Sequence, residues 1–188
     1  MPSRGVQSHL AHLVFIVGGA SSGKSDVALR LAAKSAGPMA PRAFVATGES
    51  LDEEMAMKIA RHRQSRSSTW DTAEVPLELS VWFENCARKY RLVVVDCLTM
   101  WLSNLCGRGK KDTEIIQETK TLLGVIRRSG ARVVLVSNEL GLGLVPIDAQ
   151  SRRFRDLAGN VNRLVAKAAD EAYFVVSGIP LALKKEGR

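Results

Sequence analysis

The amino-acid sequence predicts an α/β protein with a mostly parallel β-sheet flanked by helices. Short apolar runs rich in β-branched residues recur along the chain, which is typical of strands that are buried on both faces of a sheet. These runs alternate with segments of helical periodicity, and that alternation favours parallel strands joined by crossover helices. The length of 188 residues suits one domain with a sizeable core, which we place over residues 1–188.

Six strands are predicted, and five of them are nearly continuous apolar runs. They lie at 13–17 (Leu-Val-Phe-Ile-Val), 43–46 (Ala-Phe-Val-Ala), 92–95 (Leu-Val-Val-Val), 133–136 (Val-Val-Leu-Val) and 173–176 (Tyr-Phe-Val-Val), with a weaker candidate at 69–74. The residues before the first strand and the charged tail from Leu181 to Arg188 carry no comparable pattern. We therefore expect that tail to fray, with flexible ends at 1–12 and 184–188.

Helical patterns fill the intervals between these strands. Helices are predicted at 24–35, 52–65, 77–89, 113–129 and 151–169. The second of them has a clear start, because Ser50 and Glu53 form a capping box and acidic residues stabilise the positive end of a helix. Gly159 interrupts the last helical pattern. A glycine there is unfavourable for a helix, so either another segment packs closely against it or the helix breaks.

The composition limits the class of protein. The net charge is +8, yet the basic residues are scattered and aromatic residues make up 5% of the chain, so small phosphorylated ligands are favoured over nucleic acid. Cys86, Cys97 and Cys106 form no metal-ligand spacing and are predicted to be buried reduced thiols. No apolar run is long enough to span a membrane and no secretory signal is apparent, so we expect a cytoplasmic protein.

A phosphate-binding loop is the most informative motif. Residues 18–25 read Gly18-Gly19-Ala20-Ser21-Ser22-Gly23-Lys24-Ser25, which matches G-x-x-x-x-G-K-[ST] in full. The motif lies between the first predicted strand and the first predicted helix, the context in which its amide groups can surround phosphate. Lys24 would reach the β- and γ-phosphates, and the hydroxyl of Ser25 would bind Mg²⁺. The fold is therefore predicted to be P-loop NTPase-like, with a bound nucleoside triphosphate.

Asp96 follows the apolar run 92–95, which is the Walker B pattern. In a parallel sheet this carboxylate would lie at the carboxyl end of its strand, beside the phosphate loop. It would hold Mg²⁺ together with Ser25, directly or through water.

His62 has two interpretations. It continues the helical stripe of Met55 and Ile59, so it could simply cap an apolar face. However, Arg61, Arg63 and Arg66 lie near it, and positive charge would disfavour the imidazolium form. A neutral imidazole can attack phosphorus, and the arginines could bind phosphate, which favours a nucleotidyl-histidine.

The segment from Asn138 to Gly143 follows the strand 133–136. Residues after the carboxyl ends of strands line the ligand crevice of open α/β sheets, and glycines permit close approach of a ligand. The alternative is an ordinary connection between a strand and a helix.

Further stretches, in a fixed order, give the chain a resemblance to a known family. They are Ala46-Thr47 leading to Asp52-x-Glu54-Met55, Ile59-x-x-His62-x-x-x-Arg66, Trp70-x-Thr72-x-Glu74-x-Pro76, Asp96-Cys97-Leu98-Thr99-x-Trp101-x-x-Asn104-Leu105, Asn138-Glu139-x-Gly141-x-Gly143-x-Val145-Pro146, Phe154-Arg155-Asp156, Gly159-x-x-Asn162, Ala169-Asp170-Glu171 and Val176-Ser177-Gly178. Together with the phosphate loop, the pattern resembles the bifunctional adenosylcobinamide kinase / adenosylcobinamide-phosphate guanylyltransferase of cobalamin biosynthesis.

The resemblance implies two reactions. Adenosylcobinamide would be phosphorylated with ATP or GTP, and GMP would then be transferred from GTP to that phosphate, giving adenosylcobinamide-GDP and pyrophosphate. It implies that His62 carries the guanylyl group, and that the protein is a homotrimer. Lys24 would serve catalysis in both steps. The implied nucleotide contacts are the phosphate loop 18–25, Thr47, Gly48, Arg63, Gln64, Ser65, Arg66, Glu74 and Asp96.

Two other functions are compatible with the motifs when the resemblance is set aside. A simple small-molecule kinase would use only the phosphate loop and would form no covalent nucleotide adduct. A nucleotide-dependent binding module, such as a regulatory switch or a nucleic-acid-binding ATPase, would hydrolyse slowly and bind polynucleotides in a salt-sensitive way.

Overall fold

The computed structural model describes residues 11–35, 39–49 and 69–185. Within them, one seven-stranded sheet has the strand order β3-β2-β4-β5-β1-β6-β7. Its strands are β1 (Leu13–Gly18), β2 (Arg42–Ala46), β3 (Asp71–Glu74), β4 (Leu92–Asp96), β5 (Arg132–Asn138), β6 (Glu171–Val176) and β7 (Ile179–Lys184). Every neighbouring pair is parallel except β6 and β7. The prediction of a mostly parallel α/β sheet is confirmed.

The described helices are α1 (Lys24–Ser35), α3 (Leu79–Cys86) with the short 3₁₀ turn η1 (Ala87–Lys89), α4 (Leu98–Gly107), α5 (Asp112–Arg128) and α6 (Ala149–Ala168). Four of them match predicted helices within two residues at each end, if α3 and η1 are taken together. The predicted helix 52–65 lies outside the described residues. The helix α4 was not predicted.

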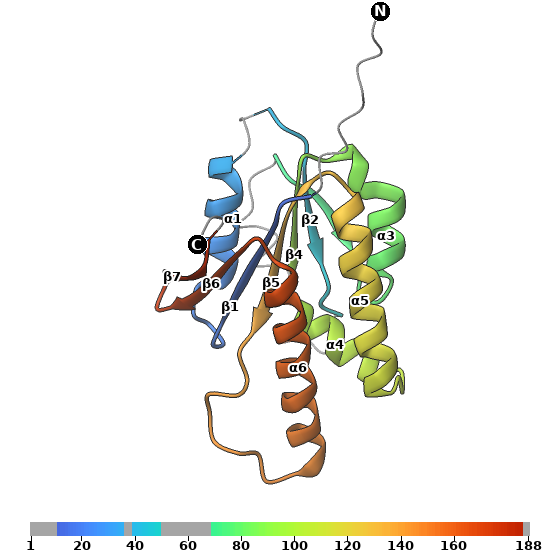
Figure 1. The fold of residues 1–188 in the computed structure, drawn as a ribbon, viewed down its shortest axis with the longest axis vertical. Coiled ribbons are helices and arrows are strands. Elements are labelled where there is room, and N and C mark those ends of the chain that lie inside the picture. Colours follow the sequence, from blue (N-terminus) through green and yellow to red (C-terminus); the bar gives the residue numbers. More distant parts are fainter. Residues whose placement is uncertain (1–10, 36–38, 50–68, 186–188) are drawn as a thin grey trace, which may run out of the picture.

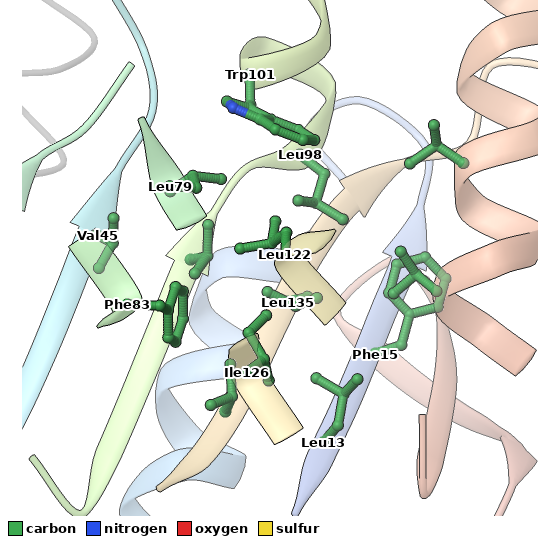
Figure 2. Packing of buried hydrophobic residues seen from close by; sticks show 14 of the residues in the cluster. Leu13, Phe15, Val45, Leu79, Phe83, Leu98, Trp101, Leu122, Ile126 and Leu135 are labelled. Carbon is green, nitrogen blue, oxygen red and sulfur yellow. The ribbon is translucent and has the colours of Figure 1, made fainter. Parts of the chain in front are cut away.

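Helices cover both faces of the sheet (Figure 1). Successive side chains of a strand point to opposite faces, so each central strand contributes to two cores. Leu13 and Phe15 of β1 pack in the larger core beneath α3, α4, α5 and α6, which Figure 2 shows around Trp101 and Phe83. Val14 and Ile16 pack on the other face, in the smaller core beneath α1.

The helix α4 escaped prediction because it is buried around most of its circumference. Leu98, Trp101, Leu102 and Leu105 are at most 1% exposed, so the segment has no polar face to mark a helical period. The polar group of its largest side chain is also satisfied within the protein, because Trp101 Nε1 donates to the carbonyl oxygen of Leu77 at 2.7 Å.

The strand β7 contradicts the prediction of a frayed tail from Leu181, because Leu181 to Lys184 pair with β6. Its side chains are largely exposed and it contains Pro180, which an edge strand tolerates. Ser177 and Gly178 form the connecting turn with φ values of 49° and 79°. Two consecutive residues of positive φ are typical of tight hairpins, so Ser177-Gly178 was the signal that could have revealed the strand.

Two residues of the other predicted flexible end make contacts with the rest of the chain. The backbone N–H of Ala11 donates to the carbonyl oxygen of Arg127 at 3.1 Å. His12 Nε2 lies 2.7 Å from Glu171 Oε1. These contacts anchor the chain two residues before β1 begins.

Gly159 neither breaks its helix nor marks a close approach within the described chain. The helix α6 runs without interruption from Ala149 to Ala168. A Cβ atom added to Gly159 would meet no atom of the described residues within 4 Å. Both alternatives drawn from the sequence for this glycine are therefore wrong for the described residues.

Candidate active site

The phosphate loop connects the end of β1 to the start of α1, as its sequence predicted. Gly18 has no room for a side chain, because an added Cβ would lie 2.4 Å from the carbonyl oxygen of Val175. Gly23 has a φ of 86° and lies against Gly178, whose Cα would be 3.1 Å from an added Cβ. Ser21 also has a positive φ, of 54°. Two of the motif's glycines thus allow a curled backbone that a chain with side chains there could not adopt.

The hairpin between β6 and β7 braces this loop from one side. The backbone N–H of Gly178 donates to the carbonyl oxygen of Ser22 at 2.8 Å. Ser22 lies in the middle of the phosphate loop, and Gly178 lies in the hairpin turn. The antiparallel edge of the sheet therefore helps to fix the loop that would surround phosphate.

Lys24 lies across the phosphate loop and is only 7% exposed. Its ammonium donates to the carbonyl oxygen of Gly19 at 2.5 Å and is 3.5 Å from Ser22 Oγ. Burial lowers the pKa of Lys24 below its ordinary value of 10.5, while Cys97 and Asp96 oppose the shift. A cation held within the phosphate loop by these two oxygen atoms suits the phosphates of a nucleotide.

The two predicted magnesium ligands meet in the structure. Ser25 Oγ donates to Asp96 Oδ2 at 2.5 Å. A hydroxyl and a carboxylate are hard oxygen donors, and Mg²⁺ is commonly held by one or two such groups together with substrate phosphates and water. The donor set therefore fits Mg²⁺. Among the described residues, no group of three His, Cys, Asp or Glu side chains could hold a metal ion, and this kind of site needs none.

Glu74, Thr47 and Asp96 lie at the same edge of the sheet. In the strand register, Glu74 pairs with Ala46 and Ala46 pairs with Asp96. Thr47 and Gly48 follow β2 directly. The carboxyl ends of three neighbouring strands thus bring these predicted contacts to one side of the phosphate loop.

The hydroxyl of Thr47 is occupied by the protein backbone. It donates to the carbonyl oxygen of Cys97 at 2.7 Å and accepts from the N–H of Cys97 at 2.8 Å, and Thr47 is fully buried. The amide of Asn104 in α4 extends this network, because Nδ2 donates to the carbonyl oxygens of Thr47 at 2.7 Å and Pro76 at 3.0 Å. These bonds hold the peptide after Asp96 in place, a role for Thr47 and Asn104 that sequence reasoning did not anticipate.

The remaining predicted residues are only partly placed. His62, the proposed guanylylated residue, and Arg63, Gln64, Ser65 and Arg66 all lie outside the described residues.

Cys97 is buried, and burial raises the pKa of its thiol to about 11, so it stays protonated. Cys86 and Cys106 are half-buried rather than buried, and all three cysteines are free.

The segment after β5 begins at the phosphate loop and then turns away. The N–H of Glu139 donates to the carbonyl oxygen of Gly18 at 2.9 Å. Farther along, Leu142, Leu144, Val145 and Ile147 are strongly exposed, with Ile147 at 99%. A groove of about 660 Å³ lies between this segment, α4 and α6, with Leu140, Phe154 and Arg155 in its lining. The start of the segment therefore adjoins the candidate site, as the first interpretation of its sequence predicted.

The helices give no sign of a membrane segment: across the described ranges, none is both long and apolar enough to cross a bilayer.

Two solved structures resemble the fold. The flagellar accessory protein FlaH from Methanocaldococcus jannaschii aligns with a TM-score of 0.55 over 94% of this chain and 80% of its own, at 14% identity. A KaiC-like protein from Pyrococcus horikoshii aligns with a TM-score of 0.53 over 92% of this chain and 81% of its own, also at 14% identity. At these identities the likeness concerns the fold alone, which is P-loop NTPase-like.

Sequence comparison identifies much closer relatives. The Bifunctional adenosylcobalamin biosynthesis protein CobP of Pseudomonas aeruginosa is 40% identical over 173 residues, covering 91% of this chain and 96% of the relative. The corresponding CobU protein of Escherichia coli is 36% identical over 184 residues, covering 92% of this chain and 99% of the relative. A family model described as Cobinamide kinase / cobinamide phosphate guanyltransferase matches residues 14–183. The chain therefore belongs to the cobinamide kinase / cobinamide phosphate guanyltransferase family, as the resemblance of its motifs implied.

Proposed function

We propose that both family activities use one nucleotide site, at the carboxyl edge of the sheet. Adenosylcobinamide is phosphorylated with ATP or GTP, and GMP is then transferred from GTP to the new phosphate through a guanylyl group on His62. The products are adenosylcobinamide-GDP and pyrophosphate. The observation that carries the proposal is the meeting of Lys24, Ser25 and Asp96 around a curled phosphate loop.

In the kinase step, a hydroxyl oxygen of the corrinoid forms a bond to the γ-phosphorus. The bond between that phosphorus and the oxygen bridging it to the β-phosphorus breaks, the nucleoside diphosphate leaves, and the hydroxyl proton passes to solvent. Lys24 and the amides of the loop hold the phosphates in line and stabilise their charge. Mg²⁺, held by Ser25 and Asp96, would supply further charge stabilisation.

In the guanylyl step, a ring nitrogen of neutral His62 forms a bond to the α-phosphorus of GTP. The bond to the β-phosphate breaks and pyrophosphate leaves. An oxygen of the corrinoid phosphate then attacks the same phosphorus, the bond to nitrogen breaks, and His62 is restored. Two transfers replace one direct displacement, so that the two anionic substrates need not be held together at once.

The state of the protein in the cell forms part of the proposal. We expect a cytoplasmic homotrimer, on the family resemblance. Light scattering of the purified protein tests the subunit number, with a mass near three times 20.5 kDa as the expected result.

Covalent labelling tests the guanylyl-histidine. The full chain is incubated with Mg²⁺ and α-³²P-GTP, denatured, and assayed for label that is labile in acid and stable in alkali. We expect label in the wild type and in His12→Ala, whose histidine lies at the opposite edge of the sheet, and none in His62→Ala. Kinase turnover should persist in His62→Ala. A wild type that binds GTP without becoming labelled would leave only the simple kinase.

A further inference from the structure

The strand β5 extends two residues beyond its neighbour β4. Asp96, the last residue of β4, pairs with Val136, whereas Asn138, the last residue of β5, pairs with Gly18. The strand β5 lies between β4 and β1. Asn138 therefore stands between the strand that carries Asp96 and the strand that leads into the phosphate loop.

The side chain of Asn138 belongs to the face of the sheet that α1 covers. Val136 and Val94 pack in the core beneath α1, whereas Ser137 bonds to a residue of α4 on the opposite face. Because side chains alternate along a strand, Asn138 shares the face of Val136, and Asp96 shares the face of Val94. The Asn138 amide and the Asp96 carboxylate are thus on the side of the sheet where the phosphate loop enters α1.

The backbone around Asn138 is fixed by three hydrogen bonds. Its N–H donates to Thr99 Oγ1 at 2.7 Å, and its carbonyl oxygen accepts from Asn162 Nδ2 at 3.0 Å. The next N–H, of Glu139, donates to the carbonyl oxygen of Gly18 at 2.9 Å. None of these bonds uses the Asn138 side chain, and its amide makes no hydrogen bond to residues 11–35, 39–49 or 69–185. A held backbone with an uncommitted amide is arranged to receive a ligand.

The hydrogen bond from Asn162 to Asn138 leaves a buried oxygen of Asn162 without a partner among the described residues. Asn162 is 7% exposed, and within the described chain its Oδ1 has no hydrogen-bond partner. A buried amide oxygen without a hydrogen-bond partner is unfavourable, and a leucine of similar size would avoid that penalty. The carbonyl oxygen of Asn138 can only accept a hydrogen bond, so the side-chain amide of Asn162 must present its Nδ2 to it. The Oδ1 of Asn162 then points elsewhere and has no partner among the described residues. Positioning of Asn138 explains why a polar side chain occupies this site.

We propose that Asn138 is a catalytic residue of the kinase activity, whose side-chain N–H donates a hydrogen bond to an oxygen of the γ-phosphoryl group. Thr99 and Asn162 are positioning residues that hold it there. In phosphoryl transfer, charge is spread over the three equatorial oxygens of the moving group. A donor carried on a backbone that is already fixed stabilises that charge with less reorganisation. The inference rests on the kinase half of the proposed function and is independent of the guanylyl-histidine.

Two substitutions of Asn138 test the proposal, because both leave its main-chain bonds intact. In Asn138→Ala, we expect kcat for transfer from γ-³²P-ATP to adenosylcobinamide to fall about 100-fold. The Kd of Mg-ADP should stay within about twofold, whereas the β,γ-imido analogue of ATP should bind less tightly, since only it presents a γ-phosphate. Asn138→Asp keeps the size but places a negative charge beside phosphate, so its loss should be larger. Asn160→Ala, an exposed asparagine on α6, should match the wild type.

The positioning role has its own test. Asn162→Leu should lower kcat without changing the Kd of Mg-ADP, and Asn162→Gln should not restore it, because the longer side chain shifts the donor. Wild-type turnover in Asn138→Ala, or equal weakening of the diphosphate and triphosphate analogues, would overturn the proposal. A wild type without phosphoryl transfer would contradict the kinase itself, and the comparison of the two analogues would still decide the role of Asn138.

Discussion

The hydroxyl of Ser25 lies 2.5 Å from the carboxylate of Asp96, although 71 positions separate them in the chain. This bond joins the first turn of α1, which follows β1, to the end of β4, and β5 lies between β1 and β4 in the sheet. A hydroxyl and a carboxylate that meet beside a phosphate loop are ready to share a divalent cation.

Replacing Asp96 with asparagine should impair both reactions by about 100-fold or more, because the neutral amide is a poorer ligand for Mg²⁺ and supplies no charge. The apparent affinity for Mg²⁺, measured by titration during turnover, should fall with it. The variant keeps the size of the side chain, so its melting temperature should stay near that of the wild type. Undiminished Mg²⁺ affinity would show that Asp96 does not hold the cation.

Lys24→Ala should abolish kinase turnover and guanylyl labelling together. Both steps act on nucleotide phosphates, and the buried ammonium over the loop is positioned to stabilise their charge. Lys120→Ala, which removes an exposed lysine from α5, serves as the control and should retain both activities. Normal kinase turnover in Lys24→Ala would contradict the assigned role.

The first two glycines of the phosphate loop should respond differently to alanine. In Gly18→Ala the new Cβ would lie 2.4 Å from a backbone oxygen, whereas at Gly19 it would meet no described atom within 4 Å. Overpacking of this kind costs about 1–3 kcal/mol, so Gly18→Ala should lower the melting temperature by about 2–10 °C. Gly19→Ala should change it little, and calorimetry of the pair distinguishes them. Equal melting temperatures would mean that β6 can move away.

Acid should destabilise the fold through the carboxylates at the amino edge of the sheet. Burial alone would raise the pKa of Asp170, but hydrogen bonds from Arg127 and from the Leu13 amide outweigh it and hold that pKa below 3.8. Burial is likewise outweighed at Glu171 by bonds from Tyr173, His12 and Arg132, which keep its pKa below 4.5.

A depressed pKa means that the native state binds the proton less readily than the unfolded state. The stabilisation is therefore complete above these ordinary values and is lost as the pH falls through the lower native ones. Urea unfolding between pH 3 and pH 7 should show this loss in the wild type and a shallower pH dependence in Asp170→Asn. Asp156→Asn, which removes a carboxylate that is 69% exposed, should keep the wild-type slope. An unchanged slope in Asp170→Asn would refute the assignment.

Much of the fold could be predicted because its strands are buried on both faces and its helices are amphipathic. Both patterns are local, so 13–17 and 113–129 are recognisable without knowledge of their partners. The helix α4 and the strand β7 break these rules in opposite ways. The helix α4 is buried on nearly all sides. The strand β7 is an exposed edge strand that pairs with β6 through the two-residue turn at Ser177 and Gly178.

Local sequence patterns likewise predicted one part of the candidate site and not the other. The phosphate loop is one continuous motif, and Asp96 ends an obvious strand, so their meeting followed from parallel topology. The Thr47–Cys97 and Asn138–Asn162 bonds join segments that are distant in the chain. Such contacts depend on strand register and on the placement of α4 and α6, which no local pattern in the sequence specifies.

The brace between Gly178 and Ser22 has a consequence for synthesis of the protein. On the ribosome the phosphate loop is made first, and the turn that supports it emerges about 150 residues later, as the two positions in the chain require. At elongation rates of about 5–20 residues per second, the loop would wait on the order of ten seconds or more for that support. A nascent chain that has not yet reached Gly178 therefore lacks this hydrogen bond, and its phosphate loop is not yet held as it is in the folded protein.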